Sequence, residues 1–94
     1  MNYSNFVVKL VKNPIQVFFN ETNYVTRLVA QIPQESENSV SAIVNISIWG
    51  KLGTNFLDYC KVNDYFIVEG YITLNSIENL EEVNISVAKI YPFF

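Results

Sequence analysis

The sequence contains no histidine and a single cysteine, Cys60, and each shortage removes a class of chemistry. Without histidine there is no imidazole to act as an acid or base near neutral pH. One cysteine permits neither an internal disulfide nor a thiolate metal cluster, so we expect no metal site. Cys60 falls where a short helix pattern needs an apolar residue. We interpret it as a small buried hydrophobic side chain rather than a reactive thiol.

Positive charge is also scarce, because six lysine and arginine residues stand against nine acids, for a formal net charge of −3. Nucleic-acid binders draw much of their affinity from cations that neutralise phosphates, so binding here requires the few cations to gather on one face.

No apolar run approaches the roughly 18 residues of a membrane span. The N-terminus lacks a basic-then-apolar signal pattern. We therefore expect a soluble, intracellular domain without membrane insertion.

Glycine and proline occur three times each, and 16% of residues are charged, which is not the composition of a disordered chain. Half of the 94 residues are hydrophobic, enough for one small core and no second one, so we predict a single domain over residues 1–94. Asp58, Asp64 and the pair Glu81-Glu82 fall in predicted loops or turns, where solvated acids are the norm. No glycine-rich phosphate loop occurs. We predict that the chain is not an enzyme and carries no cofactor.

Short segments rich in β-branched residues, separated by turns, predict an all-β domain. The predicted strands span residues 5–11, 24–32, 42–49, 65–74 and 83–90. Pro14 breaks the first strand, which residues 17–19 resume at a sheet edge. Residues 33–39 and 75–82 are predicted polar loops. Apolar residues at three-to-four spacing predict a helix of two turns at most over 53–59.

Alternation within the strands separates core from surface. The predicted core faces of the third and fourth strands are Val44, Ile46 and Ile48, and Phe66, Val68, Gly70, Ile72 and Leu74. The outward faces carry Asn45, Trp49, Tyr65 and Tyr71. Exposed aromatic rings among polar residues are typical of surfaces that stack on the bases of single-stranded nucleic acid. Alternatively, Trp49 covers a subunit interface or a neighbouring loop, and the tyrosines are half-exposed strand residues or line an interface.

The cations are spread along the sequence with no run of two. Arg27 is predicted to share the outward face with Trp49, and Lys12 lies in the loop after the first strand. Two arrangements stay open: Lys12, Arg27 and Lys51 line a shallow groove, or they are scattered, solvated side chains.

Residues 48–72 predict a strand, a tight glycine turn, a short helix and a second strand. The order of residue types, with Trp49-Gly50-Lys51-Leu52 before the helix and Glu69-Gly70 in the second strand, resembles the bacterial and organellar single-stranded DNA-binding protein (SSB) family. In particular, the chain looks like the tail-less, plastid-encoded SSB-like proteins of algae. The resemblance implies a five-stranded OB-fold barrel with one short helix between strands 3 and 4. It covers nearly the whole chain.

The resemblance also implies roles for single residues: Trp49 stacks on bases, and Lys51 lies near the nucleic-acid backbone. The family's other stacking tryptophans fall near Ser36, Ile43 and Ile77, so those platforms are missing or aliphatic here. Its fourth-strand basic residues fall on Thr73 and Asn75. The chain ends shortly after the last predicted strand, so we expect no recruitment of partners through a tail.

The predicted function is the binding of single-stranded nucleic acid, with DNA as the expected ligand. Bases stack on Trp49 and Tyr71, Arg27 and Lys51 hold phosphates, and Asn45 and Lys12 complete the predicted site. By resemblance, the protein is a homo-oligomer, a dimer or tetramer, in the plastid stroma. The alternative is an OB-fold protein-interaction or structural subunit of a larger complex that no longer binds nucleic acid. The acidic balance, the missing tryptophans and the aromatic residues 91–94 favour this alternative.

Overall fold

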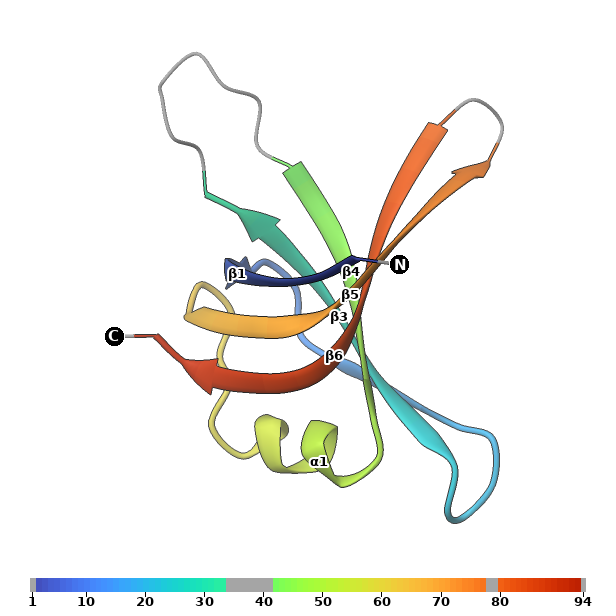
Figure 1. The fold of residues 1–94 in the computed structure, drawn as a ribbon. Helices are drawn as coiled ribbons and strands as arrows, with labels where there is room; N and C mark the ends of the chain where they lie inside the picture. The colour runs from blue at the N-terminus through green and yellow to red at the C-terminus, as the bar shows by residue number, and fades with distance from the viewer. Residues whose placement is uncertain (1, 34–41, 78–79, 94) are drawn as a thin grey trace.

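The computed structural model describes residues 2–33, 42–77 and 80–93, for which it gives six strands and one helix (Figure 1). Two predicted strands, 24–32 and 42–49, have the boundaries of β3 and β4, and the other predicted strands are also present but with different ends. The elements in chain order are β1 (Asn2–Leu10), β2 (Ile15–Phe18), β3 (Tyr24–Ile32), β4 (Ala42–Trp49), α1 (Lys51–Leu57), β5 (Tyr65–Ile77) and β6 (Leu80–Pro92).

The strands close into a five-stranded barrel with β2 added at one edge. The sheet order is β1-β5-β6-β4-β3-β2, and a further pairing of β1 with β3, through Lys9↔Gln31 and Leu10↔Ala30, closes it. β4 and β6 form a parallel pair, whereas the other paired strands are antiparallel. A closed five-stranded barrel with a short helix before its fourth strand is the OB topology, which confirms the predicted fold class. β2 is the short edge segment predicted at 17–19.

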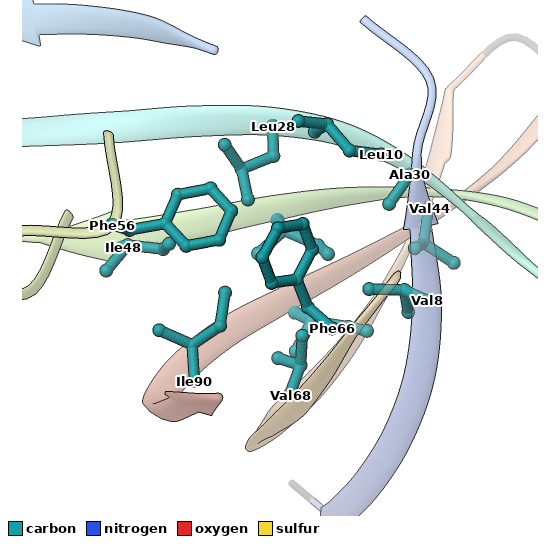
Figure 2. Close-up of a cluster of buried hydrophobic side chains, with 12 residues drawn as sticks. Val8, Leu10, Leu28, Ala30, Val44, Ile48, Phe56, Phe66, Val68 and Ile90 are labelled. Atoms are coloured by element: carbon teal, nitrogen blue, oxygen red, sulfur yellow. The ribbon is translucent and has the colours of Figure 1, made fainter. Parts of the chain in front are cut away.

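Buried apolar side chains from all five barrel strands and from α1 fill the interior (Figure 2). Phe56 of α1 is fully buried and meets Phe66 of β5 edge-on, with ring centroids 4.6 Å apart. The helix therefore closes one end of the barrel, as Figure 1 shows below the strands. The predicted core residues of β4 and the first half of β5 are confirmed as buried: Val44, Ile46, Ile48, Phe66, Val68 and Gly70.

The prediction of a polar loop over 75–82 is wrong, because most of these residues continue β5 and β6. The two strands stay paired from Leu74↔Val83 to Ile77↔Leu80. This β5–β6 arm (residues 74–77 and 80–83) stands away from the barrel in Figure 1. Leu74, predicted to be in the core, is 66% exposed for the same reason. Of the other predicted loop, 33–39, residues 34–39 lie outside the described residues.

The helix occupies 51–57 rather than 53–59, because the glycine turn comes directly before it. Gly50, at φ 69°, is its N-cap, and the chain leaves the helix at Asp58. Asn63 has a positive φ of 79°, the conformation for which Asn is tolerated. Cys60 is half-buried against the core, and burial raises the pKa of its thiol, which agrees with an unreactive side chain. No helix among the described residues is long and apolar enough to cross a membrane.

Candidate nucleic-acid interface

The register of the barrel places outward side chains of different strands in rows. Arg27 on β3 pairs with Ser47 on β4, and Ser47 pairs with Ser86 on β6. Ser86 pairs in turn with Tyr71 on β5, and Tyr71 with Tyr3 on β1. Paired residues point to the same side of a sheet. Two predicted site residues, Arg27 and Tyr71, therefore belong to one outward row, separated by three strand spacings or roughly 14 Å.

Trp49 stands at the end of β4, and its side chain is 55% exposed. Phe19, from the turn after β2, stacks on it with ring centroids 5.8 Å apart and planes inclined by 22°. Val25, which pairs with both Val17 and Trp49, is only 1% exposed although it lies on the outward face. Trp49 thus packs on a neighbouring loop, one of the alternatives for this residue, and keeps more than half of its surface accessible.

The turn that carries Phe19 is fixed by local hydrogen bonds. Asn20 Oδ1 accepts hydrogen bonds from the backbone N–H groups of Thr22 and Asn23, each at 2.9 Å. The N–H of Phe19 donates to the Asn23 carbonyl at 2.8 Å. An asparagine that caps its own turn is a common local motif. The turn that carries Phe19 is therefore ordered by its own hydrogen bonds, and Trp49 is positioned by β4.

Tyr71 is 44% exposed and meets Tyr3 edge-to-face, with ring centroids 5.0 Å apart. Sequence reasoning missed Tyr3 because the first strand was predicted to begin at residue 5. Tyr65 is 41% exposed but lies outside this pair. It lines a separate hollow together with Phe93, which is described below. The outward aromatic side chains therefore form separate pairs rather than one continuous stripe.

A cleft of about 470 Å³ lies on the outer surface and brings three predicted site residues together, Lys12, Arg27 and Asn45. Two of the three cations considered for a shallow groove, Lys12 and Arg27, line this cleft. Lys51, the first residue of α1, is exposed and is not part of the lining. Sequence reasoning missed the rest of this Lys12–Arg27 cleft, because it had placed Glu82 in a loop. The other polar residues that line it are Asn13, Ser47, Asn84 and Glu82.

The cleft adjoins Trp49 along a single strand. Ser47, which lines the cleft, precedes Trp49 by two residues, so both side chains point outward about 7 Å apart along β4. A cationic cleft next to a stacked aromatic pair is the combination that single-stranded nucleic acid requires: cations for the phosphates and a flat ring for a base.

A second hollow, of about 390 Å³, follows the end of α1 and has a different character. Tyr59, Tyr65 and Phe93 are each between 41% and 47% exposed around it, and Asp64 contributes a carboxylate. The described residues that line it include no lysine or arginine, so they offer nothing to neutralise a phosphate. Burial, and then the neighbouring Cys60, raise the pKa of the Tyr59 phenol. Within the described ranges, no group of His, Cys, Asp or Glu side chains could hold a metal ion.

Comparison with known proteins gives one strong sequence relative. The chain is 34% identical over 101 residues to the "Putative single-stranded DNA-binding protein ycf41" of Trieres chinensis. The alignment covers 99% of this chain and 89% of the relative. No protein-family model matches the chain.

Solved structures of low sequence identity share the fold. The SSB domain of a Synechococcus sp. protein superposes with a TM-score of 0.77 at 23% identity, over 97% of this chain and 94% of that one. The small single-stranded DNA-binding protein of Streptomyces coelicolor gives a TM-score of 0.81 at 13% identity, over 98% and 92% of the two chains. These likenesses confirm the OB-fold barrel.

Proposed function

Because this chain belongs to the single-stranded DNA-binding protein family, we propose that it binds single-stranded DNA on the outer face of its barrel. One base stacks on the Phe19–Trp49 pair, and Lys12 and Arg27 hold the neighbouring phosphates. The observation that carries this proposal is the position of Trp49, more than half exposed, two residues along β4 from the cleft that contains both cations. The family is a class of binding proteins, and this chain is not an enzyme.

Tyr71, backed by Tyr3, is the second stacking position in this proposal. It lies on the same outward row as Arg27, so a strand that leaves the cleft across β4 and β6 reaches it. Ser47 and Ser86 between them offer small hydroxyl groups that leave the path open. Lys51 is exposed two residues after Trp49 and adds a third phosphate contact. Asn45 contributes an amide from the floor of the cleft.

Three phosphate contacts set the strength of binding. For single strands, the logarithm of the binding constant falls with the logarithm of salt concentration by roughly 0.7 per neutralised phosphate, so a slope of about −2 is expected. That is a weak electrostatic contribution, in agreement with the net charge of −3. Stacking then supplies most of the specific affinity, at roughly 1–3 kcal/mol per base.

The test of this function is the anisotropy of a labelled oligo-dT titrated with the wild-type protein and with Trp49→Ala. The wild type should bind, and the variant should lose binding while its circular dichroism and thermal unfolding remain those of a folded barrel. If the variant binds as well as the wild type, the stacking role of Trp49 is wrong. If it stays folded but changes its molar mass, Trp49 serves an interface instead.

We also propose a homo-oligomer formed through the outer strands. β1 pairs with β5 from Asn2 to Lys9 and reaches β3 only at Lys9 and Leu10, so in the described part of the chain the other edge of β1 before Lys9 has no strand partner. An unpaired edge is a template for a second copy. Linked sites raise the affinity of a weak binder by avidity. Light scattering should give a molar mass of two or four times 10.8 kDa.

We place the protein in the plastid stroma, which its resemblance to plastid-encoded SSB-like proteins supports.

A second candidate function is the docking of a protein partner, and the hollow lined by Tyr59, Tyr65 and Phe93 favours it. Its aromatic, cation-free lining suits a protein surface rather than a phosphate. Tyr65→Ala should then weaken capture of that partner without changing oligo-dT affinity.

A further inference from the structure

The Lys12–Arg27 cleft contains one acidic side chain, Glu82, which the phosphate contacts leave unexplained. We propose that Glu82 selects the base in this cleft and favours one that carries an exocyclic amino group, as cytosine does. This inference rests on the proposed binding of single-stranded DNA and adds a base preference to it.

The cleft has two chemically different sides. Lys12, from the loop after β1, and Arg27, on β3, form the cationic side. On the other side Asn84 of β6 pairs with Asn45 of β4 in parallel register, and Glu82 precedes Asn84 by two residues on the same face of β6. Two strand spacings, roughly 10 Å, separate β3 from β6. A nucleotide can therefore place its phosphate at one side and the edge of its base at the other.

The carboxylate of Glu82 determines which side of the cleft the phosphate occupies. A phosphate next to Glu82 is repelled by the like charge, whereas Lys12 and Arg27 attract it. An ionised carboxylate only accepts hydrogen bonds. Where it faces position 4 of the base, it accepts one from the N4 amino group of cytosine but meets the O4 carbonyl of thymine or uracil acceptor to acceptor. The amides of Asn45 and Asn84 both donate and accept, so they tolerate either base. Glu82 is therefore the side chain that discriminates.

The cleft nucleotide is the neighbour of the stacked one. Ser47 in the cleft and Trp49 are successive outward residues of β4, so adjacent nucleotides of one strand reach both. The stacked position accepts any base, since each base has a flat face. The preference therefore belongs to one position within the bound strand rather than to all of them.

The experiment compares labelled oligo-dC and oligo-dU of equal length by anisotropy, at pH 8 and low salt, for three proteins. Uracil lacks the methyl group of thymine, so it differs from cytosine only in the group at position 4 and in the hydrogen on N3. The wild type should bind oligo-dC about tenfold more tightly, within the range for one good base contact. In Glu82→Gln the ratio should fall close to one, because an amide accepts from cytosine or donates to uracil. Asp58→Asn removes the same charge outside the cleft and should keep the wild-type ratio.

The alternatives give different results. If Glu82→Gln strengthens binding to both oligonucleotides by the same factor, Glu82 acts only as a repelling charge and the proposed selection is wrong. Equal binding of the two oligonucleotides by the wild type also contradicts it. If the wild type binds neither oligonucleotide, the proposed function itself fails, which is a separate outcome. Glu82 is exposed on the β5–β6 arm, so Glu82→Gln should leave the circular dichroism and thermal unfolding unchanged.

Discussion

Phe19 and Trp49 stack with ring centroids 5.8 Å apart, although one lies in the turn before β3 and the other at the far end of β4. Val25, the register partner of Trp49, is buried, although Arg27 on the same face of β3 is exposed. A large aromatic surface is thus fixed in one orientation before any ligand arrives. Such preorganisation lowers the entropy that binding must offset.

Phe19→Ala should weaken oligo-dT binding about tenfold, because Trp49 loses the ring that holds it in place, and one base stack contributes roughly 1–3 kcal/mol. The emission of Trp49 should shift to longer wavelength as its exposure rises. Phe18→Ala is the matched control: Phe18 is 61% exposed but stacks on Tyr24 rather than on Trp49. If both variants reduce affinity equally, the Phe19–Trp49 pair has no special role.

Arg27→Ala and Lys12→Ala should each weaken binding and reduce the salt slope by about 0.7, because each removes one phosphate contact. The measurement is the affinity for oligo-dT at four or five salt concentrations. Lys61→Ala removes an equal charge outside the cleft and should leave the slope unchanged. A similar loss of slope in Lys61→Ala would mean that the cations act through overall charge and not through the cleft.

Gly70→Ala should destabilise the barrel by roughly 1–3 kcal/mol, the usual cost of inserting a methyl group into a packed site. A Cβ on Gly70 would overlap the backbone carbonyl of Ser86, so the strand backbone would have to shift next to the register irregularity between β5 and β6. Thr73→Ala is the control, because Thr73 is an exposed residue of the same strand and its side chain is outside the packed core. Urea unfolding of the three proteins measures the difference. Equal stability of Gly70→Ala and the wild type would contradict the packing at this position.

Sequence reasoning succeeded where a local pattern decides the structure. The alternation of β-branched residues set the bounds of β3 and β4 and the buried face of β4, and the resemblance to a family identified the barrel. It failed on the β5–β6 arm, because a ribbon solvated on both faces has the polar composition of a loop. Leu74 and Glu82 were therefore misplaced.

Only part of the site was predicted, because only residues on regular strands follow a pattern that shows which side chains face outward. Arg27, Asn45 and Trp49 lie on regular strands, where alternation predicts which side chains face outward. Phe19 lies in a turn, and its contact with Trp49 depends on how two hairpins fold over each other. The two adjacent phenylalanines before an asparagine turn were the available signal for it. Lys51 begins a helix, so the alternation of the preceding strand no longer predicts the direction of its side chain.

In the proposed function, a base stacks on Trp49 while cations hold the adjacent phosphates. Trp49 is the only tryptophan in the sequence, so its fluorescence reports on this one position. The most direct measurement is quenching of that fluorescence by oligo-dT at low salt, followed by added salt. We expect saturable quenching that salt reverses with a slope of about −2. No quenching at high micromolar oligonucleotide would contradict it and leave the outer face of the barrel to a protein partner.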